Sequence, residues 1–169
     1  MDAATLRATQ APLKERFKSD PAAALITLRA NGAVDGDSIA CKLETGRGLA
    51  TAGLHPSAGG SGGDLCSGDM LLEALVACAG VTLKAVATAL ELPLSVARVS
   101  AEGDLDVRGA LGIDKEAPVG FREIRLRFEV GTDAPQDKLD LLLKLTERYC
   151  VVYQTIKNGP KVSVALERV

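Results

Sequence analysis

Apolar and polar residues follow two different periods along this chain, and each period predicts a different kind of element. Patterns with a period near two, typical of half-buried strands, run through residues 38–45 (SIACKLET), 49–54 (LATAGL), 94–107, 119–130 and 161–168. In the fourth of these segments the charged residues fall mainly on one face, which we expect to point outward; they are Arg122, Glu123, Arg125, Arg127 and Glu129.

Residues 70–90 (MLLEALVACAGVTLKAVATAL) predict the longest helix of the chain. Ser67 and Asp69 are suitable N-cap residues before it, and Pro93 stops it. Almost every position in the segment is apolar, whereas a helix at the surface keeps a polar stripe. We therefore expect this helix to be buried on all sides.

Two further helices are expected, over residues 1–30 and 135–150. The second has Pro135 near its start, and four of its leucines are expected to face inward, at positions 139, 142, 143 and 145. Residues 32–37 and 46–48 have the composition of turns, and residues 53–68, which contain six glycines, and 108–118 have that of loops. With 169 residues, no internal repeat and no linker, the chain is best explained as one α+β domain.

The composition excludes several classes of function. The chain has 20 basic and 22 acidic residues, two Tyr, three Phe and no Trp. Nucleic-acid binding needs a basic face or aromatic side chains for stacking, so it is not expected. A single His excludes a metal site built from several histidines. The N-terminus lacks a secretory signal pattern and no uncharged apolar run reaches about 18 residues, so we expect a cytosolic protein without a membrane span.

Four cysteines remain as candidates for chemistry. Cys78 lies in the middle of the apolar helix, where a thiol is either a small apolar filler or, if a cation or a hydrogen-bond donor stabilises the thiolate, a nucleophile. Cys150 lies between the two tyrosines of the chain, and it either completes a core layer or provides a second thiol at a helix end. Cys41, in a strand, is expected only to pack, and Cys66, in a loop, is expected to be exposed but incidental.

Other sites have weak support in the sequence. The Gly-rich loop lacks the G-K-[ST] and G-x-G-x-x-G patterns, and Asp64 and Asp69 would repel a phosphate there. His55, Cys66 and Cys41 do not have the spacing of metal ligands, and no G-x-S-x-G pattern accompanies His55 for a serine hydrolase. We therefore expect neither a metal nor a cofactor.

Three stretches together resemble the OsmC/Ohr superfamily of osmotically inducible and organic hydroperoxide resistance proteins. They are HPSAGGSGGDLCSGDMLLEALVACAGVTL, the loop RGALGIDKEAPVGF and LTERYCVVYQT. The most specific signal is a cysteine deep in a long apolar helix, with an acidic residue nine positions earlier and a second cysteine about seventy residues later. Here these are Cys78, Asp69 and Cys150. The resemblance covers residues 34–168, so we divide the chain into an N-terminal helical extension, 1–33, and an OsmC-like domain, 34–169.

The resemblance implies an α+β fold in which an antiparallel sheet wraps around the long apolar central helix and two chains intertwine as a homodimer. It implies a peroxidase that reduces organic hydroperoxides, and hydrogen peroxide as a further substrate, without a cofactor. Cys78 would attack the peroxide and become a sulfenic acid, and Cys150 would resolve it as a disulfide. Arg47, held by Asp69, would activate the thiolate, and a dithiol reductant, in this family often a lipoylated protein, would restore the thiols.

Two residues depart from the pattern of the family. Val151 stands where a proline commonly follows the second cysteine, and Asp69 stands where Glu is usual. These departures motivate an alternative function, in which a non-enzymatic OsmC-like protein binds a small hydrophobic ligand or a protein partner at the dimer interface.

Overall fold

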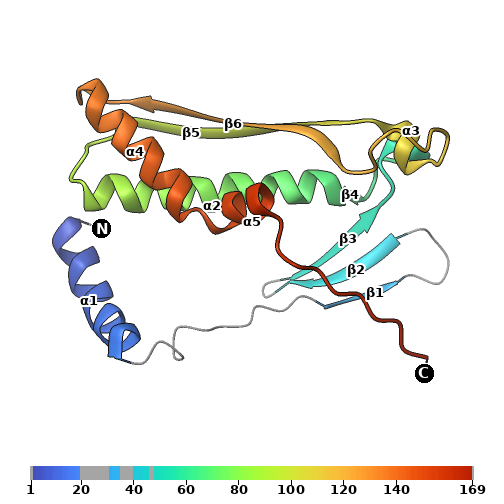
Figure 1. Cartoon of the computed structure of the whole chain (residues 1–169), viewed down its shortest axis with the longest axis horizontal. Coiled ribbons are helices and arrows are strands. Elements are labelled where there is room, and N and C mark those ends of the chain that lie inside the picture. Colours follow the sequence, from blue (N-terminus) through green and yellow to red (C-terminus); the bar gives the residue numbers. More distant parts are fainter. Residues whose placement is uncertain (1, 20–30, 35–39, 46–47, 169) are drawn as a thin grey trace.

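The computed structural model describes residues 2–19, 31–34, 40–45 and 48–168 of the chain. It is a mixed α+β fold with a long central helix, as expected (Figure 1). In chain order the elements are α1 (Ala3–Ser19), β1 (Asn31–Val34), β2 (Ala40–Thr45), β3 (Gly48–Gly53), the 3₁₀ helix η2 (Pro56–Ala58), β4 (Leu65–Cys66), α2 (Ser67–Ala89), β5 (Val96–Leu105), α3 (Val107–Ala110), β6 (Phe121–Gly131), α4 (Gln136–Tyr149) and α5 (Val151–Asn158).

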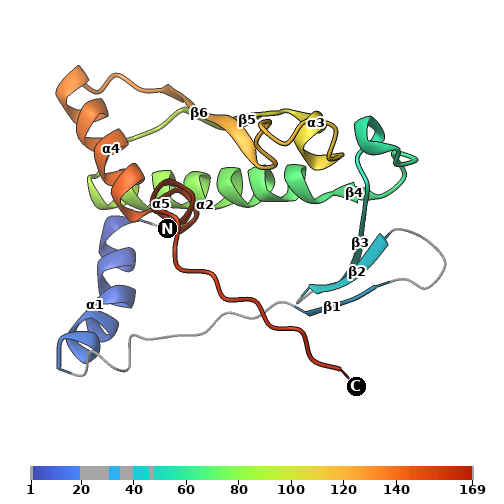
Figure 2. The ribbon, with the colours of Figure 1, turned by 45° about the vertical axis from the view of Figure 1, so that its right-hand side comes forward.

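The centre of the fold is α2, which lies along the antiparallel pair β5–β6 and is crossed by α4 and α5 (Figures 1 and 2). Its buried residues recur every three or four positions, as one face of a helix requires; they are Leu75, Ala79, Leu83, Val86 and Ala87. The core is closed by Leu142 of α4, and side chains of the sheet such as Val99 and Phe128 pack around it. The N-cap is Cys66, one residue before Ser67, so neither Ser67 nor Asp69 caps the helix as expected.

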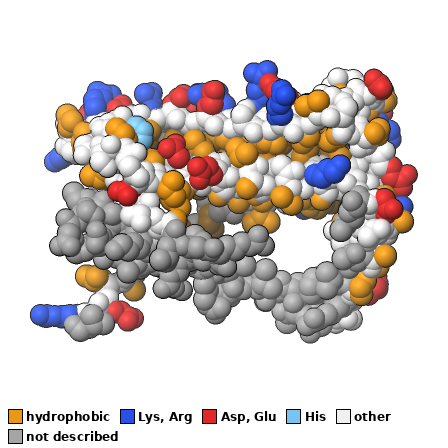
Figure 3. All heavy atoms as spheres, turned by 180° about the vertical axis from the view of Figure 1, so that it is seen from behind, with side chains coloured by type: hydrophobic (Ala, Val, Ile, Leu, Met, Phe, Trp, Pro, Cys, Tyr) orange, Lys and Arg blue, Asp and Glu red, His pale blue; other side chains and the backbone are white. Residues whose placement is uncertain are grey.

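The expectation that α2 is buried on all sides is wrong for the single chain. Val81 is 72% exposed and Leu71 is 41% exposed, because the sheet, α4 and α5 cover only part of the helix. Seen from behind, hydrophobic side chains gather at the level of α2, below a charged border (Figure 3). The helix is also long and apolar enough to cross a membrane, but core helices of soluble proteins share both properties, so this is weak evidence for a span.

The outer face of the β5–β6 sheet is charged, which confirms the expected alternation. Exposed Glu123, Arg125, Arg127 and Glu129 alternate with partly buried apolar residues along β6. Arg125 lies opposite Glu102 and donates hydrogen bonds to it and to Asp104, so the charges pair across the two strands. The alternation fails at Arg122, where the register with β5 shifts.

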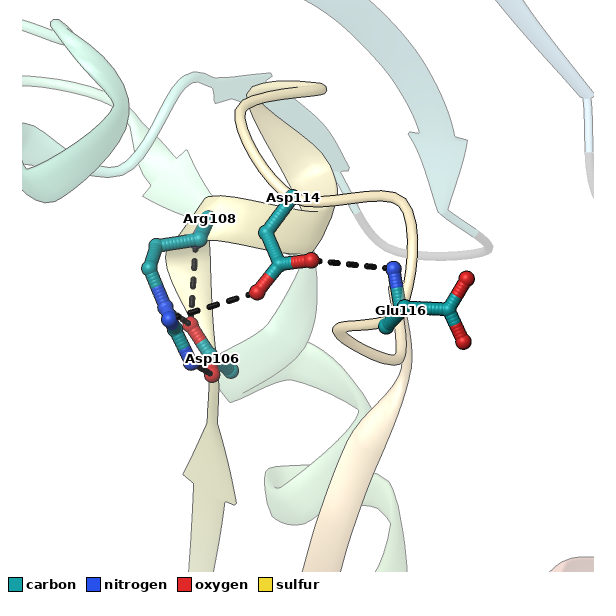
Figure 4. Close-up of polar contacts among 4 residues, drawn as sticks. All are labelled: Asp106, Arg108, Asp114 and Glu116. Atoms are coloured by element: carbon teal, nitrogen blue, oxygen red, sulfur yellow. Dashed lines mark hydrogen bonds and ion pairs between the residues drawn. The ribbon is translucent and has the colours of Figure 1, made fainter.

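Arg108 organises the connection between β5 and β6 (Figure 4). Its guanidinium contacts the carboxylates of Asp106, at 2.6 Å, and Asp114, at 3.3 Å. The hydrogen bonds donated by Arg108 lower the pKa of Asp106 to about 2. Asp114 in turn accepts the N–H of Glu116. These contacts hold a short helix, α3, at the start of residues 108–118, which were expected to be loop only.

The N-terminal half forms a separate four-stranded sheet in the order β1-β2-β3-β4, set off from α2 (Figure 2). The strands expected at 38–45 and 49–54 are confirmed as β2 and β3, although residues 38 and 39 lie outside the described part. Residues 31–34 form β1 where a turn was expected, and η2 and β4 interrupt the Gly-rich loop. In the expected N-terminal helix, α1 covers residues 3–19, and 20–30 lie outside the described part.

The C-terminal region differs from the expectation at two places. A separate helix, α5, follows the expected helix 135–150 after a break at Cys150. Residues 161–168, expected to be a strand, pair with no other strand of the described chain and are exposed along their length. A strand requires a neighbour to satisfy its backbone groups, and the single chain offers none at this position.

Adjacent leucines of α4 provide a test of where the core lies. Leu142 is 2% exposed, whereas Leu143, which was expected to face inward, is 44% exposed. We expect Leu142→Ala to lower the free energy of unfolding by about 2–5 kcal/mol, because it leaves a cavity beside Leu83 and Val86. Leu143→Ala is the control and should cost less than about 1.5 kcal/mol. Urea denaturation measures both, and equal losses would contradict this placement of the core.

Candidate functional site

The structure brings together two of the cysteines, Cys78 and Cys150, which are 72 positions apart in the sequence. Cys78 lies in the middle of α2, and Cys150 lies between α4 and α5, both of which pack against α2. The two thiols are hydrogen-bonded to each other. Cys150 has no exposed surface, and Cys78 is half-buried. Any reagent that reaches the pair therefore meets Cys78 first.

The position of Cys150 depends on a break in the helical backbone. Its φ of −73° and ψ of 107° are extended, so α4 ends and α5 begins at this one residue. Its N–H donates to the carbonyl of Thr146, the last bond of α4, and its carbonyl accepts the N–H of Gln154, the first bond of α5. The N–H groups of the first turn of a helix have no partner within that helix. Those of α5 are therefore free to interact with the two sulfur atoms.

The Cys78 thiol has a lowered pKa although it is partly buried. Burial alone would raise the pKa, because it disfavours the thiolate. Hydrogen bonds to the sulfur outweigh this effect; the donors are the N–H groups of Val152 and Val151, the Cys150 thiol and the Thr82 side chain. No cationic side chain of the described residues is among these main contributions. The start of α5 thus provides the positive electrostatic environment that a reactive cysteine requires.

The Cys150 thiol has a raised pKa. Burial is the main cause, and the hydrogen bond and the negative charge of Cys78 add to it. The N–H groups of Tyr153 and Val152 offset only part of the increase. At neutral pH the pair is therefore asymmetric, with the thiolate on Cys78 and the proton on Cys150.

The other residues predicted for the site are not brought to the thiols. Arg47 lies outside the described residues. Asp69 is exposed in the first turn of α2, nine residues before Cys78, which is about 13 Å along the helix axis and about two and a half turns away. Its carboxylate therefore points to the opposite face of α2, toward Ala101 of β5. Within one chain it cannot contact Cys78.

The remaining candidates of the sequence are separate from the thiol pair. Cys66 is half-buried at the start of α2, beyond Asp69, and the expectation that it is exposed is therefore wrong. The backbone of Cys41 lies in β2, as expected. His55 accepts the N–H of Ser57 and so stabilises the start of η2.

An apolar groove of about 760 Å³ begins beside the thiol pair. Leu75, one helical turn before Cys78, lines it, and so does Tyr153 in the first turn of α5. Its other lining residues are apolar inside and charged at the border; they are Phe121, Arg122, Glu123, Ile124, Leu126, Arg127, Phe128, Leu143, Glu147, Ile156 and Lys157. The arrangement fits a molecule with an apolar body and a polar end.

Comparison with known protein families matches residues 60–165 to OsmC-like protein. The chain belongs to this family. The match includes both thiols, α2 and the groove, so the OsmC-like part of the chain contains the whole candidate site. No curated protein matches the chain.

Solved structures show the same fold at low sequence identity. The OsmC-like protein from Mycoplasma pneumoniae is 16% identical, with a TM-score of 0.65 over 79% of this chain and 89% of the other. The organic hydroperoxide resistance protein OsmC from Legionella pneumophila is 18% identical, with a TM-score of 0.61 over 80% and 92%. The organic hydroperoxide resistance protein OhrB of Bacillus subtilis is 16% identical, with a TM-score of 0.52 over 79% and 93%.

Sequence analysis of this OsmC-like protein missed the donors to Cys78. Two of them are backbone N–H groups, which every residue except proline carries and which leave no pattern in a sequence. The third, Thr82, lies four positions after Cys78, and this spacing was a usable signal because residues four apart share a helix face.

Val151 allows the contribution of one backbone donor to be tested. Proline at this first position of α5 would remove the N–H and keep the helix, and the extended Cys150 before it is compatible with proline. We expect Val151→Pro to raise the pKa of Cys78 by about one unit, because a hydrogen bond to the thiolate is lost. The rate of Cys78 alkylation against pH, followed by peptide mass spectrometry, measures the shift. Val151→Ala keeps the N–H and should match the wild type; identical profiles for both variants would contradict the assignment.

Proposed function

We propose that this OsmC-like protein is a thiol peroxidase that reduces organic hydroperoxides. The observation that carries the proposal is the contact between two thiols whose pKa values are shifted in opposite directions, down for Cys78 and up for Cys150. A peroxidatic cysteine must be a thiolate at neutral pH, and a resolving cysteine must lie within reach of it. Related folds that are named organic hydroperoxide resistance proteins support the same function.

The first step is attack of the Cys78 thiolate on the distal oxygen of the hydroperoxide. The S–O bond forms as the O–O bond breaks, so sulfur is oxidised to a sulfenic acid and the peroxide is reduced to an alkoxide, which takes a proton and leaves as the alcohol. The half-buried Cys78 is the sulfur that the substrate reaches, since Cys150 is covered.

In the second step Cys150 attacks the sulfenic sulfur. The S–S bond forms, hydroxide leaves and takes the proton of the Cys150 thiol, and the product is water. A dithiol reductant, such as a lipoylated protein, then exchanges with the disulfide in two steps and leaves both cysteines reduced. The sum of the cycle is one hydroperoxide and one dithiol converted to one alcohol, one water and one disulfide.

The groove beside the thiols favours organic hydroperoxides over hydrogen peroxide. Its interior is apolar, with Leu75, Leu126 and Phe128 among the lining residues, and it begins where the peroxide oxygen would meet Cys78. Burial of an alkyl or aryl group there would contribute about 25 cal/mol per Å² of apolar surface. Hydrogen peroxide has no apolar group and would gain nothing from the groove.

Activation by Arg47 and Asp69 stays part of the proposal. Since Asp69 points away from Cys78 of its own chain, a carboxylate from this position would have to reach a thiol of a second chain. The donors of α5 already lower the pKa of Cys78 in one chain, so an arginine would add to this effect instead of being its sole source.

We also propose that the working form is a homodimer. Val81 on α2 is exposed, and the C-terminal segment exposes Val162, Val164 and Leu166 at 77%, 93% and 99%. Within the described residues β5 and β6 pair only with each other, and a two-stranded sheet is marginally stable alone. A second copy would cover the apolar face of α2 and would provide a neighbour for the alternating segment 161–168.

The thiol chemistry is tested with tert-butyl hydroperoxide and dithiothreitol. We expect Cys78→Ser to abolish turnover, because no other thiol lies at the start of α5 and the groove. Cys150→Ser should still consume about one equivalent of peroxide and accumulate a sulfenic acid, which dimedone traps at Cys78. Cys66→Ser, a half-buried cysteine away from the pair, is the matched control and should keep full turnover.

The same experiment separates the two functions that the sequence left open. In the wild type, peptide mapping after peroxide addition without reductant should find Cys78 linked to Cys150. If both thiols stay free and no peroxide is consumed, the peroxidase proposal is wrong. The groove would then favour the alternative, a non-enzymatic protein that binds a small hydrophobic ligand, and mass spectrometry of the purified protein would look for one.

Charge placed on the C-terminal segment tests the dimer. The double variant Val164→Asp, Leu166→Asp puts carboxylates on the apolar side chains that the partner would bury, so we expect dissociation to monomers in sedimentation velocity. Ser163→Asp places a carboxylate at an alternate position of the same segment and should stay dimeric. A wild type that sediments as a monomer at every concentration would refute the dimer.

A further inference from the structure

Thr82 differs from other helical threonines of the chain in where its hydroxyl points. Thr88 on α2 donates its hydroxyl to the carbonyl of Lys84, at 2.8 Å, and Thr146 on α4 donates to the carbonyl of Leu142, at 2.7 Å. Both acceptors are the carbonyl four positions earlier, which is the usual partner of a threonine inside a helix. For Thr82 the residue four positions earlier is Cys78, and there the side chain bonds the sulfur.

We propose that Thr82 is a further catalytic residue: its hydroxyl donates a hydrogen bond to the Cys78 thiolate and holds the sulfur toward the start of α5. The inference rests on the proposed function for its role in turnover, but the contact itself does not depend on it. Thr82 is half-buried on the same face of α2 as Cys78, one helical turn away. The branched side chain of threonine has few rotamers in a helix, so its hydroxyl is held in place.

The Thr82 donor is distinct from the donors of α5. Val151 and Val152 approach the sulfur from the facing helix, whereas Thr82 belongs to the same helix as Cys78. It therefore keeps its contact with Cys78 if α5 shifts when Cys150 moves to form the disulfide. A donor on α2 also offsets the cost of burying a negative charge beside the apolar groove, since a thiolate without donors would be protonated there.

The experiment compares four variants in the full-length protein with all cysteines present. Thr82→Val removes the hydroxyl and keeps the shape, Thr82→Ala removes it with a higher helix propensity, and Thr82→Ser keeps it. Thr88→Val, on the same helix, is the matched control, because its hydroxyl bonds a carbonyl and no thiol. Alkylation of Cys78 by iodoacetamide is followed by peptide mass spectrometry against pH, and circular dichroism checks that each variant is folded.

We expect the pH midpoint of Cys78 alkylation to rise by about one unit in Thr82→Val and Thr82→Ala, and to stay at the wild-type value in Thr82→Ser and Thr88→Val. The rate of reaction with tert-butyl hydroperoxide should fall up to about tenfold below the midpoint and recover at alkaline pH, where the thiolate forms without the donor. A purely structural role for Thr82 would not give a deficit that disappears with pH.

Two results overturn the proposal: midpoints of Thr82→Val and Thr82→Ala that equal the wild-type value, or a shift in Thr82→Ser as large as in Thr82→Val. The alkylation profile separates this inference from the proposed function. If the midpoint shifts as expected but the wild type consumes no peroxide, Thr82 is the donor to Cys78 and the peroxidase proposal is wrong.

Discussion

The candidate site depends on one break in the backbone, at Cys150 between α4 and α5. A continuous helix would use every N–H of this region for its own hydrogen bonds, and none would be left for a sulfur atom. The extended conformation of Cys150 starts a new helix opposite the middle of α2, so the free N–H groups of Val151 and Val152 meet Cys78. The same break points the Cys150 thiol at Cys78, which gives one local feature two consequences for the chemistry.

The sequence was a good guide to α2 and to the pairing of the thiols, but not to the way Cys78 is activated. The apolar run 70–90 indicates a buried helix, and the family resemblance pairs Cys78 with Cys150. The break at Cys150 has no signal in the sequence, because neither proline nor glycine marks it and both flanking segments favour a helix. Activation was therefore assigned to Arg47 and Asp69, whereas in the described chain backbone donors and Thr82 provide it.

Two of the wrong expectations have one physical cause. The apolar positions all around α2 and the alternating pattern of residues 161–168 predict more burial than one chain provides. A pattern of hydrophobic residues reports the environment in the final assembly, and it does not say which chain supplies that environment. Val81 and Leu166 are therefore better explained as positions covered by a second copy than as failures of the pattern.

The opposite pKa shifts of the two thiols also explain how one site could serve both steps of the proposed cycle. Burial raises the pKa of Cys150, and the hydrogen bond and the charge of the Cys78 thiolate raise it further. Oxidation of Cys78 to a neutral sulfenic acid removes that charge, so the part of the shift that it causes disappears. The N–H groups of Val152 and Tyr153 continue to favour the thiolate of Cys150. Cys150 therefore holds its proton while Cys78 is the nucleophile, and it becomes more acidic when the sulfenic acid that it must attack has formed.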